Sequence, residues 1–402
     1  MAIYKYVGRN RKGQLKKGTL EAINKNQAIA KLREDGISPR DISEAKGIFY
    51  KEITIGNPVK HQHFVIYCRQ FATLIRAGVS IVDSTKILAD QTEDKYLKKV
   101  LKAIVDELRT GIPFSDAANK HHKIFPPIFV NMVRAGEASG SLDETLERLA
   151  SYFEKQYDLK KKVQSTLAYP ITLLVIIIAV VSFLMLSIVP TFTGMFEQFG
   201  SELPAITQFV VNVSDGLKNY WWLILFIITT IVSVFSFLMK TNKQFHYSVH
   251  VALLKMPIFG VLLQKSAIAR MTRTLSSLVS SSVQILQALT IVEKVVDNPV
   301  IGRVVLDSRD SLEKGERLSA PLEKSWVIPP LVTQMVAIGE ETGSLDYMLA
   351  KVADFYEAEV DRTVDTLKSL IEPLMIVLLA GVVGTVVLSI MVPMFSIFSE
   401  VQ

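Results

Sequence analysis

Long apolar runs interrupt an otherwise amphipathic chain. No charged residue occurs from Val163 to Phe196, and the run at 170–189 is long enough for ~20 helical residues to cross a hydrocarbon core of about 30 Å. Two further runs, at 221–239 and 373–392, have the same character, and Tyr220 begins an aromatic edge typical of a membrane interface. The pattern therefore predicts three transmembrane helices.

Before the first and third spans, polar and apolar residues alternate with the period of a helix. The clearest case is Asp94–Arg109, whose apolar residues form one stripe and which is followed by Gly111, a typical left-handed C-cap. About six helices fit within residues 61–168, and the pattern returns within 263–372. We therefore expect a mostly α integral membrane protein with two six-helix bundles, the last helix of each leading into a span.

A short motif occurs once in each bundle and identifies a duplication. The sequence Gly-Glu-Ala-Ser-Gly-Ser-Leu-Asp at 136–143 is matched by Gly-Glu-Glu-Thr-Gly-Ser-Leu-Asp at 339–346. The prolines that begin and end the first span, Pro170 and Pro190, lie at the same distances from the motif as Pro373 and Pro393 of the third span. The chain is thus predicted to repeat one unit, a helical bundle followed by a membrane helix.

The motif has three interpretations. In the structural one, Gly136 and Gly140 allow positive φ in a tight connection between helices, and Ser141 forms a capping box with Glu144. In the second, Glu137 and its acidic neighbours bind a hard cation such as calcium, although their spacing is not that of a calcium loop. In the third, the motif contacts a partner protein.

Residues 1–46 are predicted to form a separate α/β domain, followed by a linker at 47–60. Two strands flank a basic turn that includes Arg9–Lys12, and a helix and a third strand follow. Three interpretations remain for the turn: a solvated or lipid-facing hairpin, a protein-docking face, or a nucleic-acid contact. The last lacks the stacking aromatic residues and recognition helix that usually accompany it.

The distribution of basic residues predicts the orientation in the membrane. Lys160–Lys162 precede the first span. After the second span, every charged residue from Lys240 to Arg273 is basic. Because basic residues are enriched on the cytoplasmic side, both bundles are expected inside the cell. The link at 190–220 and the tail at 393–402 are then extracytoplasmic.

Composition narrows the functional classes. The 402 residues are 49% hydrophobic, with a mean hydropathy of +0.30 and one cysteine, Cys68, which we expect to be a core thiol. Phosphate-binding loops, zinc-binding helix motifs and nucleophile elbows do not occur, and His246 and His250 are more typical of a membrane-edge pair than of a metal site. We therefore expect neither an enzyme nor a cofactor, and the absence of ionisable residues within the spans disfavours solute transport.

Small residues interrupt the third span. Gly381 and Gly384, within the sequence Ala-Gly-Val-Val-Gly at 380–384, suit a close contact between helices. Generic packing of membrane helices explains them equally well.

The paired Gly-Glu-x-x-Gly-Ser-Leu segments, the duplicated bundles and the three spans resemble the type II secretion system F protein family. The family includes the platform proteins of type II secretion, type IV pili and competence pseudopili. The likeness covers nearly the whole chain, including residues 190–192 and 203–207 of the link, and the N-terminal unit is similar to the small domain of the longer, pilus-type members. The resemblance implies a multi-pass inner-membrane platform that self-associates.

The resemblance also implies partners: a hexameric cytoplasmic ATPase, pilins or pseudopilins, other inner-membrane assembly proteins and membrane lipid, without specific binding of nucleic acid. ATPase-driven motion would pass from the bundles through the helices that enter the membrane at Pro170 and Pro373 and would insert or extract pilin subunits. The matching motif residues, candidates for partner contact or for folding alone, are Gly136, Glu137, Gly140, Gly339, Glu340 and Gly343. The alternatives are a membrane transporter or channel and a membrane-anchored sensor.

Overall fold

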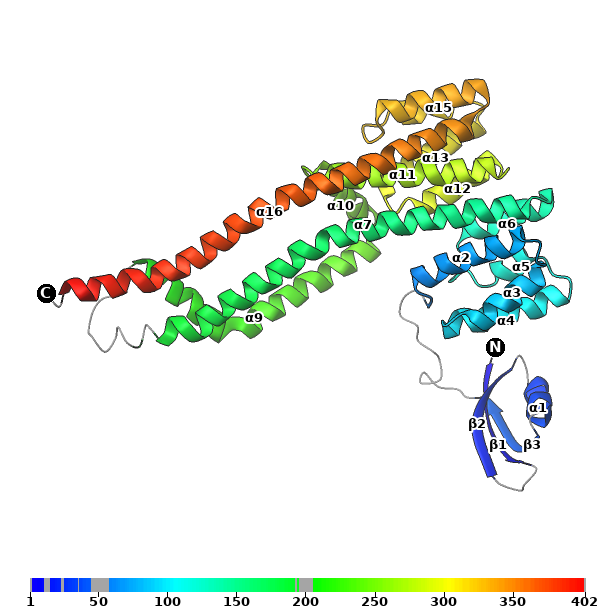
Figure 1. Ribbon diagram of the computed structural model, residues 1–402, viewed down its shortest axis with the longest axis horizontal. Helices are drawn as coiled ribbons and strands as arrows, with labels where there is room; N and C mark the ends of the chain where they lie inside the picture. Colours follow the sequence, from blue (N-terminus) through cyan, green and yellow to red (C-terminus); the bar gives the residue numbers. More distant parts are fainter. Residues whose placement is uncertain are drawn as a thin grey trace. The chain divides into compact units, whose positions relative to one another are not determined.

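The chain folds into two units, residues 1–58 and 59–402, in a computed structural model (Figure 1). The structure describes residues 2–10, 15–22, 25–34, 36–44, 58–191, 194 and 205–400. Most of the predicted linker at 47–60, and Arg11 and Lys12 of the predicted basic turn, lie outside the described residues.

The first unit is a three-stranded antiparallel sheet with one helix. The sheet has the order β2-β1-β3, and the elements are β1 (Ala2–Asn10), β2 (Leu15–Ala22), α1 (Lys25–Glu34) and β3 (Ile37–Glu44). Leu32 of α1 is buried with Ile37 and Ile42 of β3, so one face of the helix covers the sheet. The predicted small α/β domain is confirmed.

The second unit contains two copies of a six-helix arrangement. The helices of the first copy are α2 (His61–Arg76), α3 (Ile81–Gln91), α4 (Lys95–Arg109), α5 (Phe114–Asn119), α6 (Pro127–Ser139) and α7 (Leu142–Phe183). Those of the second copy are α11 (Phe259–Ser280), α12 (Ile285–Val295), α13 (Pro299–Glu313), α14 (Ser319–Glu323), α15 (Pro330–Thr342) and α16 (Leu345–Glu400). The helices α9 (Ala205–Thr241) and α10 (Lys243–Lys255) lie between the copies in sequence. The mostly α fold with a repeated bundle is confirmed.

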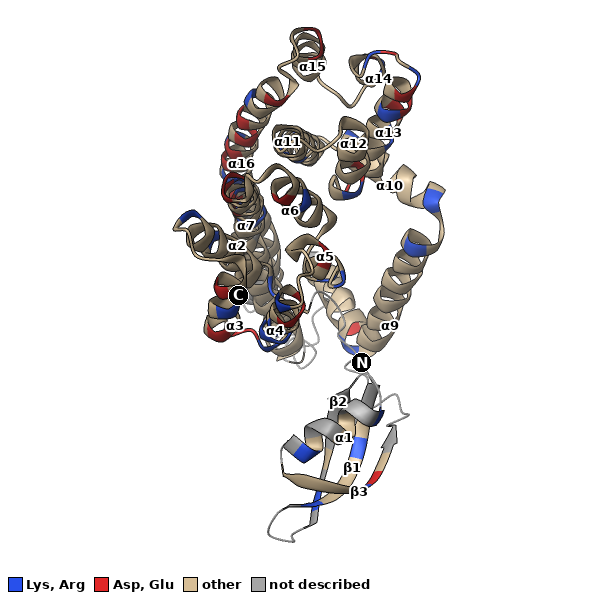
Figure 2. Cartoon of the chain, turned by 90° about the vertical axis from the view of Figure 1, so that its right-hand side faces the viewer, with Lys and Arg blue, Asp and Glu red and all other residues tan. Residues whose placement is uncertain are grey.

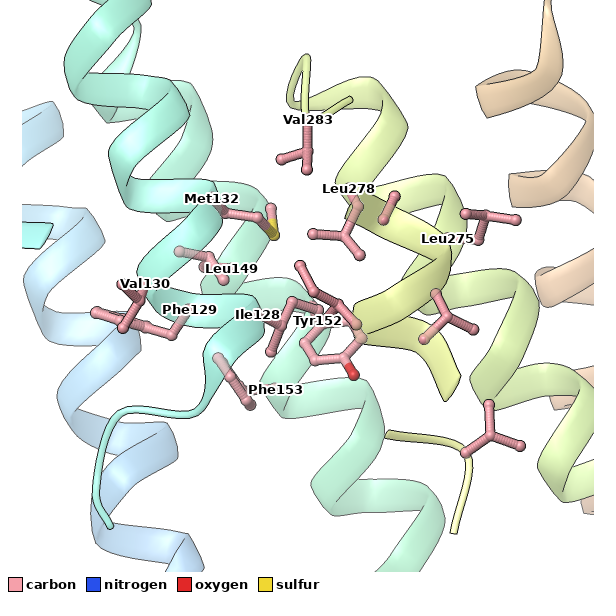
Figure 3. Packing of buried hydrophobic residues seen from close by; sticks show 14 of the residues in the cluster. Ile128, Phe129, Val130, Met132, Leu149, Tyr152, Phe153, Leu275, Leu278 and Val283 are labelled. Carbon is pink, nitrogen blue, oxygen red and sulfur yellow. The ribbon is translucent and has the colours of Figure 1, made fainter. Parts of the chain in front are cut away.

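One hydrophobic core runs through both bundles. Ile128 of α6, Tyr152 of α7 and Leu278 of α11 are buried in the same cluster, which Figure 3 shows at the junction of these helices. The hydroxyl of Tyr152 lies 3.0 Å from that of Thr274, so the buried polar groups of the two copies satisfy each other. Each large apolar side chain buried here stabilises the fold by about 1.5–3 kcal/mol. The two predicted bundles are therefore fused into one body.

The last helix of each bundle continues into an apolar span. Helix α7 passes through Pro170 and is followed by a π-helical turn, η2 (Leu184–Ile188), while α16 passes through Pro373 and Pro393. In the part of the chain that the structure describes, three helical segments are long and apolar enough to cross a membrane: Leu142–Thr191, Thr207–Thr241 and Leu345–Ser389. They contain the predicted spans at 170–189 and 221–239, and the third overlaps the predicted span at 373–392 as far as Ser389.

Helix α9 is longer than the predicted second span, which began at Trp221. It begins at Ala205, so the second half of the predicted link at 190–220 is helical. Val210 of α9 is buried against Met185 and Val386, which belong to the ends of the other two spans. Burial of this apolar face stabilises helical structure that the local sequence alone does not indicate.

Candidate functional site: motif corners, ion pairs and membrane contacts

The motif forms the corner between α6 and α7, and its copy forms the corner between α15 and α16. Helix α6 extends to Ser139, so the connection to α7 is short. Gly140 has φ 72° and Gly343 has φ 71°, the left-handed conformation that favours glycine after a helix end. The predicted positive φ is confirmed for Gly140 but wrong for Gly136, which lies within α6.

The positions of Gly136 and Gly339 require glycine because the next helix approaches closely. A Cβ atom at Gly136 would lie 2.8 Å from Oγ1 of Thr145, and one at Gly339 would lie 2.9 Å from Cα of Leu345. Both distances are shorter than van der Waals contact. These two glycines therefore allow each corner to fold back tightly.

Glu137 and Glu340 cap a short helix that lies far from them in sequence. Oε1 of Glu137 accepts a 2.8 Å hydrogen bond from the N–H of Phe114, at the start of α5. Oε1 of Glu340 likewise accepts a 2.7 Å bond from the N–H of Leu318, directly before α14. The first N–H groups of a helix lack partners within the helix, and a carboxylate also complements the positive end of its dipole.

The capping bonds favour the structural interpretation of the motif over calcium binding. The second oxygen of Glu137 lies 3.3 Å from the N–H of Ser115, and that of Glu340 lies 3.2 Å from the hydroxyl of Ser319. Both oxygens of each carboxylate thus accept bonds from the protein, and these oxygens would otherwise be the cation ligands.

The predicted capping box of Ser141 and Glu144 is wrong. The Ser141 hydroxyl lies 2.7 Å from the Ser139 hydroxyl, and the backbone of Ser141, at φ −107° and ψ 45°, departs from the extended conformation typical of a capping residue. Glu144 instead pairs with Arg148 one turn later, at 3.8 Å. The second corner repeats this geometry, with 2.6 Å between the hydroxyls of Thr342 and Ser344.

A second duplicated feature is an ion pair between the first and last helix of each bundle. Nε of Arg69 on α2 lies 2.6 Å from Glu154 on α7, and Nε of Arg273 on α11 lies 2.7 Å from Glu357 on α16. Arginine and carboxylate match in planar geometry, which makes such pairs specific. These pairs were not predicted from the sequence, although their residues repeat at nearly the spacing of the motif.

Further ion pairs join α7 to α16. Nζ of Lys155 on α7 lies 3.2 Å from both Asp354 and Glu357, and acidic residues recur along α16 in Figure 2. Burial raises the pKa of Asp354, but hydrogen bonds from Arg273 and Lys155 outweigh this effect, so its pKa is lowered overall. Because the side chains of Arg273 and Glu357 are only 12% and 21% exposed, water screens this pair less than an ordinary surface pair.

Within the spans, Ser214 of α9 satisfies a carbonyl group that Pro190 leaves without a donor. In the π-helical register a carbonyl bonds the N–H five residues later, and for Met185 that residue is Pro190, which has no N–H. The Ser214 hydroxyl donates a 2.5 Å hydrogen bond to the Met185 carbonyl. Such a group unsatisfied in lipid would cost several kcal/mol.

Thr207 of α9 satisfies the corresponding carbonyl group in the third span. Helix α16 is α-helical around Pro393, so the missing N–H is the one that would bond the carbonyl of Ser389, four residues earlier. The Thr207 hydroxyl donates a 2.8 Å hydrogen bond to this carbonyl, and the hydroxyl is buried. The predicted prolines at the ends of the spans therefore determine where α9 attaches to α7 and α16.

The small residues of the third span are on its surface. A Cβ atom at Gly381 or Gly384 would meet no described atom within 4 Å, and the chain itself makes no close approach to them in the residues described. The predicted close contact with another helix therefore stays a prediction, beside generic packing.

The buried Cys68 fits the predicted core thiol. Its side chain is 2% exposed, and burial raises the pKa of the thiol well above its usual value. A thiol held protonated in this way is a poor nucleophile.

Two fused copies of a helical bundle, each ending in a long apolar helix, define an integral membrane protein that arose by duplication. The family described as "Type II secretion system (T2SS), protein F" matches residues 67–190 and 271–393, one match for each copy. The family described as "Type II secretion system protein F, N-terminal domain" matches residues 1–43. The chain belongs to the type II secretion system protein F family.

Relatives in this family are similar to the chain over its whole length. Type IV pilus assembly protein PilC of Thermus thermophilus is 39% identical over 408 residues, covering 100% of both chains. Type IV pilus assembly protein PilC of Myxococcus xanthus is 37% identical, covering 100% of this chain and 96% of its own. Type II secretion system protein F of Xanthomonas campestris is 34% identical, again covering 100% of both.

We predict that Glu137→Ala lowers the free energy of unfolding by about 1–2 kcal/mol, because the N–H groups at the start of α5 lose their acceptor. Denaturant unfolding of the full-length protein in detergent, followed by circular dichroism, measures the change. The matched control is Glu144→Ala, whose side chain is 70% exposed and which should change stability by less than ~0.5 kcal/mol. Equal effects of the two variants would show that the cap contributes nothing.

We predict that Gly339→Ala destabilises the protein by about 1–3 kcal/mol, since the added methyl group meets the backbone of Leu345. Gly302→Ala is the control, because a Cβ there lies 3.5 Å from its nearest neighbour, an ordinary contact, and alanine favours a helix. Thermal unfolding in detergent compares the two. If Gly339→Ala left thermal unfolding unchanged, the corner would accommodate the methyl group without a loss of stability.

We predict that the ion pair of Arg69 and Glu154 makes the free energy of unfolding decrease at acidic pH. Hydrogen bonds from Arg69 lower the pKa of Glu154, so the pair stabilises the fold above the unfolded pKa of about 4.3, and this contribution is lost as pH falls through the lower folded value. Arg69→Met should be less stable at neutral pH and lose less stability on acidification. Arg134→Met, which removes an exposed pair, is the control. Unfolding at a series of pH values measures both; a slope for Arg69→Met equal to that of the unmodified protein would contradict the prediction.

Proposed function

We propose that the protein is the inner-membrane platform of a type IV pilus, type II secretion or competence pseudopilus machine. In this role it couples a cytoplasmic assembly ATPase to the insertion or extraction of pilin subunits, and it catalyses no reaction itself. The observation that carries the proposal is the continuity of α7 and α16, which run from the shared core into the spans. The names of the relatives, pilus assembly and type II secretion proteins, support the same role.

In the proposed orientation, the N-terminus and both bundles (residues 61–168 and 263–372) are cytoplasmic. The basic residues Lys160–Lys162 and Lys240 then lie at the cytoplasmic ends of the first and second spans. The segment between the first and second spans and the C-terminal tail are extracytoplasmic.

The fused core suggests how motion would pass through the protein. Because Tyr152 and Leu278 belong to one packed cluster, displacement of one bundle moves the other with it. Helices α7 and α16 then move together, joined by Lys155 and its partners on α16. In this scheme the motif corners maintain the shape of the surface that the ATPase contacts.

Self-association or pilin contact would use the small residues on the surface of α16. Gly381 and Gly384 allow the backbone of another helix to approach closely, which is how membrane helices associate without a hydrophobic driving force between them.

Photo-crosslinking in cells tests the platform role. A photoreactive amino acid replaces Asp143, which is exposed at the first corner, or Gly384 in the third span, and crosslinked partners are identified by mass spectrometry. We expect the assembly ATPase at the first position and a pilin at the second. A probe at Phe226, which is 68% exposed on α9, is the control for general contact within the membrane.

Other crosslinking results have defined meanings. A second copy of the chain at Gly384 would show self-association there and remove α16 as the pilin contact. A permease or receptor as the only partner would contradict the platform role. The crosslinked pilin would identify whether the machine builds a pilus, secretes protein or takes up DNA.

A further inference from the structure

An exposed apolar elbow joins α10 to α11. The two helices meet at an angle of 110°. Large apolar side chains on and beside this bend are between 41% and 47% exposed: Met256, Ile258, Phe259, Val261 and Leu263. A contiguous exposed apolar patch of this kind usually marks a surface that contacts another molecule or a membrane.

The elbow has a strained but well-defined backbone. Ile258 has φ 67° and ψ −61°, and the N–H of Phe259 donates a 2.8 Å bond to the carbonyl of Pro257, which together form a γ-turn. Positive φ at a β-branched residue costs about 1–3 kcal/mol. Gly260 is required as well, because a Cβ there would lie 2.2 Å from the Leu254 carbonyl oxygen. The fold thus maintains, at a cost, a turn that places apolar side chains in solvent.

The elbow lies beside the last helical turns before the membrane. Leu262, on the inner side of the elbow, is buried against Leu367 of α16, and Val163 of α7 packs against the same cluster. Leu367 precedes Pro373, where the third span begins, by six residues, or roughly 9 Å along a helix. The exposed side of the elbow is therefore close to the level at which the spans begin.

A tryptophan and a lysine extend the apolar patch. Trp326 is 56% exposed, and the next residue, Val327, accepts a 2.7 Å bond from the Gln264 side chain of α11, which fixes this loop beside the elbow. Nζ of Lys255 lies 5.8 Å from the centre of the Trp326 ring. Tryptophan is enriched at membrane interfaces, where lysine extends its charge toward the headgroups.

We propose that the elbow and Trp326 insert into the cytoplasmic leaflet as an interfacial anchor of the second bundle. Lipid is the occupant because the patch adjoins the spans, is bordered by a lysine and follows the end of α9 by one short helix. Helix α11 does not itself cross the membrane, since its buried face, including Ile268 and Leu275, belongs to the bundle core. The inference rests on the proposed cytoplasmic side of the bundles and is independent of the ATPase.

A series of single-tryptophan proteins tests the anchor in bilayers. The chain has three tryptophans, so Trp221→Phe and Trp222→Phe leave Trp326 alone. Further replacement of Trp326 by Phe gives a background for Phe259→Trp at the elbow. Full-length protein is reconstituted in vesicles of phosphatidylethanolamine and phosphatidylglycerol with or without bromine on the acyl chains near the headgroup, and bromine quenching of emission is measured.

Two further sites in the chain serve as controls, one for strong quenching and one for no quenching. Phe226→Trp on α9 and Tyr347→Trp at the start of α16 use the same background, and these sites are 68% and 57% exposed. Position 226 lies in a span and should be strongly quenched. Position 347 lies in the bundle, more than twenty residues before Pro373, and should not be quenched.

We expect tryptophans at 259 and 326 to lose at least half as much emission as that at 226. Quenching no greater than at 347, with 226 quenched normally, would overturn the anchor while leaving the platform role unaffected. The same result would follow if a partner protein or a second copy, rather than lipid, covered the elbow. Far-ultraviolet circular dichroism of each variant confirms that it has folded.

Discussion

The pairing of α7 with α16 is the contact on which the rest of the structure depends. These helices contribute Tyr152 and Tyr356 to the single core, and the charged network of Lys155 joins them above the membrane. Each also packs against the first helix of its own bundle, α2 in one copy and α11 in the other. Because both continue into spans, a change in their relative position would have to disrupt the core, the ion pairs and the membrane contacts together.

The membrane imposes a second constraint, which α9 resolves. A proline near the end of each repeated span leaves a carbonyl without its donor, and no water is present in hydrocarbon to replace it. Ser214 and Thr207 lie seven positions apart on one helix, about two turns, so the same face of α9 reaches both carbonyl groups. Helix α9, which is not repeated, thus joins the two repeated spans at the carbonyl groups that their prolines leave without a donor.

The sequence allowed the fold class, the duplication and the spans to be predicted because these depend on composition, periodicity and repeats. The role of Glu137 could not be predicted, since its donors in α5 are more than twenty residues away and helix capping is usually a local pattern. The capping box was wrong because Ser141 had a nearer hydroxyl partner in Ser139. The π-helical turn before Pro190 was also hidden, because its stability depends on Ser214 from another helix.

The two copies retain the same internal contacts but differ at their surfaces. The capping glutamate and the arginine pair occur in both, whereas the exposed ion pairs near the corners involve different positions of the repeat: Arg134 of α6 faces Asp116, and Glu341 of α15 faces Arg317. Among the described residues, the strained elbow stands before the second copy, whereas residues 58–60, directly before α2, form no such turn. Duplication followed by divergence therefore leaves one bundle with a surface suited to lipid, and the shared core lets that attachment restrain both bundles.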